Sequence, residues 1–130
     1  MTTATLSIGI SRLGQIQIRT HDVERAAAFY ENVLGLKLLF KAPPGLAFFD
    51  CGGVRLMLDR PEKQEFDHAS SILYFAVPDI QAAYAKMKGS GVRFEDEPHM
   101  IARMPDHDLW MTFFRDTEDN LLALMSEVKR

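Results

Sequence analysis

The sequence has little of several features that would assign it to a particular class of protein. It contains one cysteine among 130 residues, so no disulfide can form within the chain. Its formal net charge is -3, which argues against a duplex-binding protein, because such proteins neutralise phosphates with clustered Lys and Arg. No apolar stretch approaches the length of about eighteen residues that a membrane helix needs. We therefore expect a cytoplasmic protein with neither nucleic acid nor membrane among its partners.

What the chain does have is the composition of a globular domain. The hydrophobic fraction is 47% and the charged fraction 25%, which is typical of a folded chain rather than a disordered one. A chain of 130 residues can bury a core without help from disulfides or a structural metal. We therefore expect residues 1–130 to form a single domain.

Two stretches of the sequence follow the same pattern, 57 residues apart. In each, an Asp precedes apolar residues at the i, i+3, i+4, i+7 spacing of one helix face, and a Gly follows. An Asp in that place can accept a hydrogen bond from the first turn of a helix, and a Gly tolerates the conformation that often ends one. This duplication predicts two helices, which start after Asp22 and Asp79 and end before Gly35 and Gly91.

Each predicted helix is preceded by one predicted strand and followed by three. Alternating or apolar segments bounded by turn residues predict the strands. They are residues 15–19, 36–41, 46–50 and 54–59 in the first half, and residues 71–77, 92–101, 108–115 and 121–126 in the second. The expected fold is therefore α+β, with duplicated βαβββ modules that form a cupped mixed sheet around a cleft. Module one is about residues 14–59, the linker about 60–69, and module two about 70–127.

One helix for four strands leaves each sheet with a covered face and an open face. The alternation of side chains assigns residues to each face. The predicted covered face has Ile16, Ile18, Leu56, Leu58, Leu73, Phe75, Leu122 and Leu124. The predicted open face has Gln15, Gln17, Arg19, Arg55, Met57, Asp59, Ile72, Tyr74, Ala76, Leu121, Ala123 and Met125. Such a mixed face suits a small-molecule pocket, although it could instead, or also, pair with another subunit.

Two motifs in the sequence resemble a known superfamily. The run AAAFYENVLGL at 26–36 resembles a helix end written FY-x-x-VLG, and FFRDTEDN at 113–120 resembles a turn written F-x-DPDGN. Both are motifs of the vicinal oxygen chelate superfamily, which includes glyoxalase I, bleomycin-resistance proteins and extradiol dioxygenases. Thr117 and Asp119 replace the usual Pro and Gly of the turn, and Asp tolerates a positive φ. The resemblance covers about residues 15–127 and implies this fold and a homodimer.

The resemblance also implies four metal-ligand positions that face the cleft. They correspond here to Gln15, Met57, Ile72 and Ala123. Zn²⁺, Ni²⁺ or Fe²⁺ needs at least three N, O or S donors, and of these four side chains only the amide oxygen of Gln15 could serve. A shift of one residue along any of the other three strands brings in no His, Glu or Cys. We therefore expect no metal at the usual site and no cofactor.

The remaining polar chemistry is concentrated at residues 98–111. His99 and His107 flank a predicted hairpin whose strands could bring them together. A His beside a carboxylate is a suitable general base near neutral pH. Alternatively, the hairpin is simply exposed and anchored by Trp110, or the two His and an Asp form a partial metal site. The last alternative requires both imidazoles on one face.

Two main functions follow from these observations, and whether the chain is an enzyme stays open. The first is a metal-independent binder, similar to the bleomycin-resistance proteins, that holds a neutral or anionic organic molecule in the cleft. Its predicted ligand contacts are Gln15, Gln17, Arg19, Arg55, Met57, Tyr74, Arg103 and Trp110. The second is a glyoxalase-like lyase, isomerase or epimerase with His99 or His107 as the base, with or without a metal at a non-standard site. A metal-dependent glyoxalase-type enzyme is a third possibility, supported only by the frequency of such enzymes in the superfamily.

Overall fold

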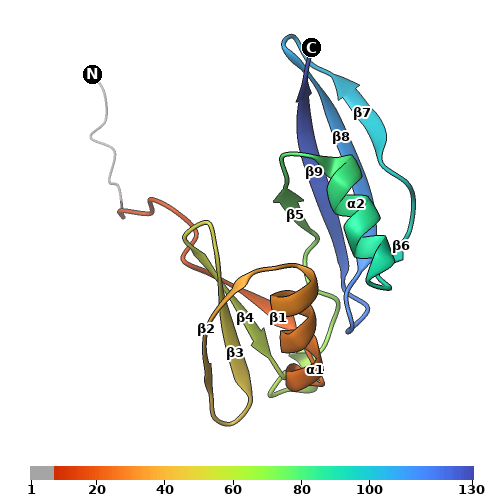
Figure 1. The fold of residues 1–130 in the computed structure, drawn as a ribbon. Helices are drawn as coiled ribbons and strands as arrows, with labels where there is room; N and C mark the ends of the chain where they lie inside the picture. Colours follow the sequence, from red (N-terminus) through yellow and green to blue (C-terminus); the bar gives the residue numbers. More distant parts are fainter. Residues whose placement is uncertain (1–7) are drawn as a thin grey trace, which may run out of the picture.

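The computed structural model describes residues 8–130, and its strands form two sheets (Figure 1). Residues 1–7, which the prediction of a single domain includes, lie outside this description. Sheet A has the order β1-β4-β3-β2, with β1 (Gln15–Arg19), β2 (Lys37–Ala42), β3 (Leu46–Cys51) and β4 (Val54–Asp59). Sheet B has the order β5-β9-β8-β6, with β7 also paired to β8. Its strands are β5 (Leu73–Ala76), β6 (Arg93–Phe94), β7 (His99–Arg103), β8 (His107–Arg115) and β9 (Leu121–Lys129).

Both sheets are mixed in the same way, which confirms the predicted α+β fold class. In each sheet the strand before the helix pairs in parallel with the last strand of its half, β1 with β4 and β5 with β9. The other pairs are antiparallel. None of the helices within residues 8–130 is long and apolar enough to cross a membrane.

The two main helices begin at the predicted caps. α1 (Val23–Ala28) follows Asp22, whose carboxylate accepts a hydrogen bond of 3.1 Å from the backbone N–H of Arg25. α2 (Ile80–Gly89) follows Asp79, which accepts an equivalent bond of 3.1 Å from Ala82. α1 continues into a π-helical turn, η1 (Phe29–Val33), and the linker contains a short 3-10 helix, η2 (Gln64–Phe66). The capping signals in the sequence therefore predicted both helix starts correctly.

The predicted strand at 92–101 is wrong, because the structure divides it into β6 and β7. Asp96 lies between these strands, and its carboxylate accepts hydrogen bonds of 2.8 Å from the hydroxyl of Thr112 and from the backbone N–H of Phe113. The Asp96 side chain thus occupies the Phe113 N–H, a backbone donor of β8 that a continuous strand could use. Pro98 follows and has no N–H to add to the ladder.

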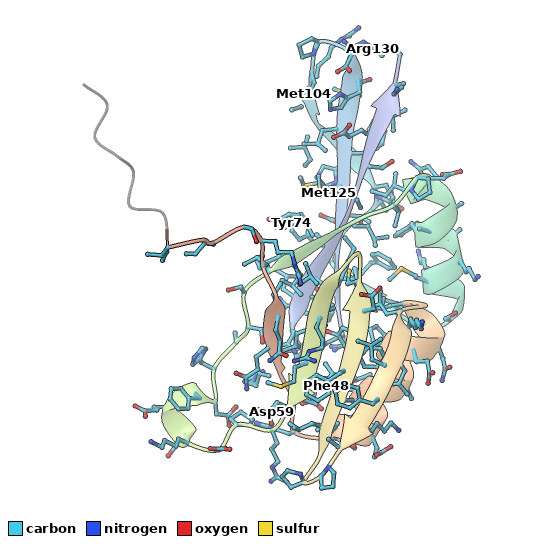
Figure 2. All side chains as sticks on the ribbon, turned by 90° about the vertical axis from the view of Figure 1, so that its left-hand side faces the viewer. Phe48, Asp59, Tyr74, Met104, Met125 and Arg130 are labelled. Carbon is cyan, nitrogen blue, oxygen red and sulfur yellow. The ribbon has the colours of Figure 1, made fainter. Side chains whose placement is uncertain are left out.

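Each helix covers one face of one sheet. α1 packs on β3 and β4, and α2 packs on β8 and β9. Figure 2 shows both helices on the same side of the molecule, with the other side of each sheet uncovered. The side chains predicted for the covered face are buried or pack against a single core that draws on both sheets: Ile18, Leu56, Leu58, Leu122 and Leu124 are buried, and Ile16, Leu73 and Phe75 are partly buried.

The turn at 116–120, between β8 and β9, ties the second half of the chain to the first. Asp116 is buried, and its carboxylate accepts hydrogen bonds from the Tyr30 hydroxyl (2.7 Å), from the Asn120 side chain (3.0 Å) and from two backbone N–H groups of the turn. Burial, and then the charge of Asp116, raises the pKa of Tyr30, so the phenol keeps its proton and donates. Asp119 has φ 63, so it adopts the left-handed conformation expected at this position.

Candidate functional site

The open face of sheet A carries a connected set of side chains from β1 and β4. The parallel register places Gln15 opposite Arg55 and Gln17 opposite Met57. The Arg55 Nε–H donates to Gln15 Oε1 at 2.8 Å, and the Gln15 amide N–H donates to Met57 Sδ at 3.6 Å. The sequence predicted these residues on one face, and the structure brings three of them into direct contact.

Two phenylalanines that the sequence reasoning did not single out lie beside this set. Phe48 on β3 is the register partner of Met57, and Phe40 on β2 is the partner of Phe48. Their rings are stacked with centroids 4.5 Å apart, and the guanidinium carbon of Arg55 lies 4.9 Å from the Phe48 centroid. This is within the range of a cation–π interaction. Because Phe48 and Phe49 are adjacent, hydrophobicity alone could not show which of them faces the core.

Asp59 lies at the end of β4, on the same face. Its Oδ2 accepts a 3.0 Å hydrogen bond from the side chain of Gln17. Burial, and then the charge of Glu62, raises the pKa of Asp59 above its usual value. A cavity of about 820 Å³ opens here, lined by Met57 and Asp59 together with the loop before α1, the turn between β2 and β3 and the segment after β4.

The open face of sheet B is largely apolar. Tyr74 on β5 lies opposite Ala123 on β9, which in turn lies opposite Phe113 on β8. The rings of Tyr74 and Phe113 meet edge to face with centroids 5.8 Å apart. Met111 and Met125 form the next pair along the same strands, and Figure 2 labels Tyr74 and Met125 on this part of the molecule. This surface can contact an apolar ligand but offers it few hydrogen bonds.

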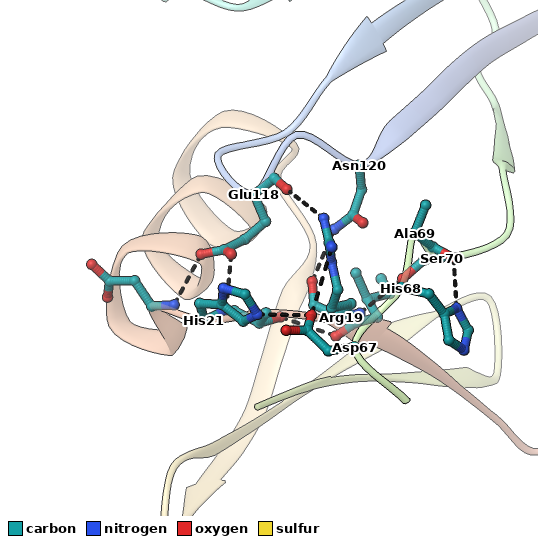
Figure 3. A network of polar contacts seen from close by, with 11 residues as sticks. Arg19, His21, Asp67, His68, Ala69, Ser70, Glu118 and Asn120 are labelled. Atoms are coloured by element: carbon teal, nitrogen blue, oxygen red, sulfur yellow. Dashed lines mark hydrogen bonds and ion pairs between the residues drawn. The ribbon is translucent and has the colours of Figure 1, made fainter. Parts of the chain in front are cut away.

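Arg19 was also predicted as a ligand contact, but its side chain is engaged in the polar network that joins the two halves (Figure 3). One terminal nitrogen lies 3.6 Å from the carboxylate of Asp67, and the other donates to the backbone carbonyl of Glu118 at 3.3 Å. Asp67 also bonds His21 Nε2 at 2.8 Å. Glu118 accepts hydrogen bonds from the backbone N–H groups of His21 (2.8 Å) and Asp22 (2.9 Å). The charge of Arg19 is therefore already compensated.

The structure does not bring His99 and His107 together. His99 lies opposite Met111, which is four residues along β8 from His107, a spacing of about 13 Å along the strand. His99 Nδ1 is 2.8 Å from the carbonyl of Glu97, and His107 Nδ1 is 2.7 Å from the carboxylate of Asp106. The hydrogen bond from His107 holds the pKa of Asp106 below its usual value. The two imidazoles share a face by the alternation of β8, but they are too far apart to bind one ion.

Trp110 and Arg103 lie away from the open faces. Trp110 is two residues from Thr112 and four from the buried Phe114 on β8, so it points to the covered side of sheet B. It packs against the core and lines a separate cavity of about 400 Å³ near the start of α2. Arg103 is an exposed residue at the end of β7, opposite Asp108. Neither side chain lies beside Gln15, Arg55 or Met57.

The four positions that the resemblance assigns to a metal can be tested against this geometry. The one candidate oxygen, Gln15 Oε1, already accepts a hydrogen bond from the guanidinium of Arg55. A divalent cation at this oxygen would lie next to a positive charge. No group of three or more His, Cys, Asp or Glu side chains within residues 8–130 is arranged to hold a metal ion.

Comparison with known proteins places this geometry in context. The uncharacterised protein YraH of Bacillus subtilis is 26% identical, over 87% of this chain and 96% of that protein. A glyoxalase/bleomycin resistance protein/dioxygenase superfamily member from Sphaerobacter thermophilus has the same fold, with a TM-score of 0.76, 24% identity and coverage of 91% of this chain and 98% of that one. Lactoylglutathione lyase from Agrobacterium tumefaciens aligns with a TM-score of 0.71 and 22% identity, over 89% of this chain and 93% of that chain.

A family model gives the assignment directly. It matches residues 12–124, which include all of sheet A, sheet B up to the first part of β9, both main helices and both of the motifs identified in the sequence. The chain therefore belongs to the Glyoxalase/Bleomycin resistance protein/Dioxygenase superfamily.

Proposed function

We propose that this chain binds a neutral or anionic organic molecule in the cleft bordered by its open sheet faces, without the metal that many members of the superfamily use. The observation that carries the proposal is the 2.8 Å hydrogen bond from Arg55 to Gln15 Oε1. This hydrogen bond occupies the oxygen that would have to be the first ligand of a metal, and it holds a guanidinium cation beside that oxygen. A cation in this position attracts a negative or electron-rich group on a ligand and repels a second cation.

The chemistry of the other three metal positions supports the same conclusion. Met57 has a thioether whose sulfur already accepts a hydrogen bond, and Ile72 and Ala123 have hydrocarbon side chains. Neither thioether nor hydrocarbon replaces the imidazole and carboxylate donors that Zn²⁺, Ni²⁺ or Fe²⁺ requires. The same side chains are well suited to contact an organic molecule, since Met adapts its shape to a ligand.

We further propose that the protein acts in the cytoplasm as a homodimer, each chain being one domain of two modules. Large apolar side chains are exposed on sheet B and at its margin, among them Tyr74 (46%), Met100 (49%) and Ile101 (46%). Large apolar side chains left exposed are found at interaction sites. A second copy that packs over Tyr74 would also cover the open face of sheet B.

The test is a ligand screen on the tag-free protein in the presence of a metal chelator. Thermal melts would be recorded with panels of small carboxylates, their neutral amides and the corresponding amines. The proposal predicts that some carboxylates or amides raise the melting temperature, because a ligand that binds only the folded state stabilises it. Stabilisation that appears only after a divalent metal is added, or only with amines, would contradict it.

A lyase, isomerase or epimerase is the alternative, and the position of His107 favours it. Its Nδ1 lies 2.7 Å from the Asp106 carboxylate and its Nε2 4.0 Å from Glu127, so a carboxylate can orient the imidazole as a base. In this alternative either His107 or His99 removes a proton from the substrate. Once a substrate is found, His107→Ala should lower turnover by about 10²-fold or more if His107 is the base, and His99→Ala should do so if His99 is. Full turnover in both variants would exclude both residues.

A further inference from the structure

The guanidinium of Arg55 is held differently from the other arginines of the chain. All of them lie within the residues that the structure describes, and five contact another side chain through the guanidinium. Four of these five have a carboxylate partner: Arg19 with Asp67, Arg93 with Asp119, Arg115 with Glu95, and Arg130 with Asp108. Arg55 instead contacts the neutral amide of Gln15 and the ring of Phe48. Its charge is oriented but has no carboxylate partner among residues 8–130.

The two carboxylates that the strands place near Arg55 are engaged elsewhere. Asp50 is the register partner of Arg55 across β3 and β4, but its Oδ1 accepts a hydrogen bond from the backbone N–H of Gly53 at 3.3 Å. Asp59, two residues further along β4, accepts from Gln17. Neither Asp50 nor Asp59 forms an ion pair with Arg55.

The free part of the Arg55 side chain is its terminal pair of nitrogens. Nε is bound to Gln15, whereas neither Nη atom has a hydrogen-bond or ion-pair partner anywhere in residues 8–130. A guanidinium presents its N–H groups in a rigid planar fork that matches the two oxygens of a carboxylate. Because Nε is fixed and the group rests on Phe48, less conformational freedom is lost when a ligand binds.

The surface next to Arg55 is apolar. Met57 lies beside Gln15, and Phe40 stacks on Phe48 with 46% of its own surface exposed. Arg55 supplies one positive charge, and Asp50 and Asp59 are negative charges in the same region. A ligand with one negative charge therefore suits the site better than a ligand with two. The site therefore combines a fork for one carboxylate with an apolar surface for the rest of a molecule.

We propose that Arg55 is the anion-recognition residue of this face, and that the ligand is a small organic monocarboxylate whose apolar part lies on Met57 and on Phe40, the exposed ring that stacks on the buried Phe48. This inference rests on the proposed function and names the ligand class for the same site. Gln15 acts as a positioning residue, because its Oε1 fixes the guanidinium.

The experiment compares matched ligands and matched variants by calorimetric titration of the tag-free protein with a chelator present. The probes are benzoate, phenylacetate and hexanoate, each paired with its neutral amide. At least one carboxylate is expected to bind about tenfold or more tightly than its amide, which corresponds to about 1.4 kcal/mol. Arg55→Gln should abolish this preference. Arg55→Lys should keep part of it, because the charge remains while the fork is lost.

The control variant is Arg25→Gln, which removes one guanidinium from α1, on the covered side of sheet A. It is expected to bind the carboxylates as the parent protein does. The Nε–H resonance of Arg55 in a ¹H–¹⁵N spectrum provides a second readout, and it should shift on addition of the carboxylate but not of the amide. Thermal melts establish that each variant is folded.

The outcomes separate this inference from the proposed function. If carboxylates and amides bind equally well, and Arg55→Gln changes neither, the carboxylate assignment is overturned while the proposed ligand-binding function stands. An equal loss in Arg25→Gln would also overturn it, because the effect would then be one of overall charge. If none of the six probes binds, the assignment to this ligand class is rejected. The broader ligand screen described under the proposed function then tests whether the chain binds a neutral or anionic molecule at all.

Discussion

The open face of sheet A and the open face of sheet B have the same strand register but carry different side chains. In both sheets the strand before the helix pairs in parallel with the last strand of its half, so equivalent positions can be matched one by one. Gln17 matches Tyr74, Arg19 matches Ala76, Met57 matches Ala123, and Asp59 matches Met125. By the same offset in the sequence, Gln15 corresponds to Ile72, the residue just before β5. The sheet A residue is polar or contains sulfur in every case. The corresponding sheet B residue has a plain hydrocarbon side chain, except for Tyr74 and Met125.

This difference shows what a duplicated backbone fixes and what it leaves free. The strands determine which side chains point away from the helices, whereas an open face can exchange polar for apolar residues at little cost to the core. Sheet A uses that freedom to build a hydrogen-bonded set around Arg55. Sheet B uses it to present an aromatic and methionine surface. The two faces therefore differ in chemistry, polar and charged on sheet A and apolar on sheet B.

The largest expected effect comes from separating the two regions. Asp116→Ala removes the buried carboxylate that accepts from Tyr30 and Asn120, and leaves the Tyr30 hydroxyl without its partner. We expect a loss of about 3 kcal/mol in the free energy of unfolding, measured by urea denaturation. Asp106→Ala, at an exposed position, is the control and should unfold at nearly the same urea concentration as the parent protein. Similar stability in both variants would contradict the role assigned to the turn.

The role of Gln15 in positioning Arg55 can be tested while Arg55 itself is kept. Gln15→Glu places a carboxylate next to the guanidinium and supplies the counterion that the site lacks, so carboxylate affinity should fall about tenfold. Gln15→Ile, which copies the equivalent residue of sheet B, leaves the guanidinium charged but unfixed and should weaken binding less. Titration with benzoate, phenylacetate and hexanoate measures both effects. Tighter binding in Gln15→Glu would contradict the proposal.

The aromatic surface of sheet B can be tested on its own. Tyr74→Ala removes the edge-to-face contact with Phe113 and should lower stability by about 1 kcal/mol. Tyr74→Phe keeps the ring and should unfold at the parent urea concentration. A loss in Tyr74→Phe as large as in Tyr74→Ala would assign the effect to the hydroxyl group instead of the ring.

The smallest expected effect concerns Asp59 and depends on pH. Burial and Glu62 raise the pKa of Asp59 above 3.8, so the folded chain retains this proton at pH values where the unfolded chain has released it. The contribution of this group to stability is therefore fully present below the unfolded-state pKa and is lost as the pH rises through the folded-state value. Asp59→Asn should then unfold at a slightly higher temperature than the parent at about pH 7 and at the same temperature at about pH 3. A variant that is less stable than the parent at about pH 7 would contradict this sign.

Much of the fold could be predicted because its signals are local. The Asp caps, the helical spacing and the strand alternation each depend on a few neighbouring residues, and they placed Gln15 and Met57 on the open side correctly. The division of residues 92–101 was missed because it depends on a contact between Asp96 and Thr112, sixteen residues away.

The site was less predictable because its features depend on register and on pairs of side chains. The sequence predicts Trp110 as a ligand contact, but the face on which Trp110 lies depends on how β8 pairs with β9. Arg19 has a carboxylate partner because the path of the linker brings Asp67 to it, whereas no carboxylate among residues 8–130 pairs with Arg55. No spacing within the sequence contains this information.

The most direct test of the central claim is elemental metal analysis of the purified, tag-free protein, combined with thermal melts with and without a chelator. If Arg55 occupies the place of the metal, the protein should contain no stoichiometric metal, and the chelator should leave the melting temperature unchanged. Near-stoichiometric metal, together with a melting temperature that the chelator lowers, would contradict the account.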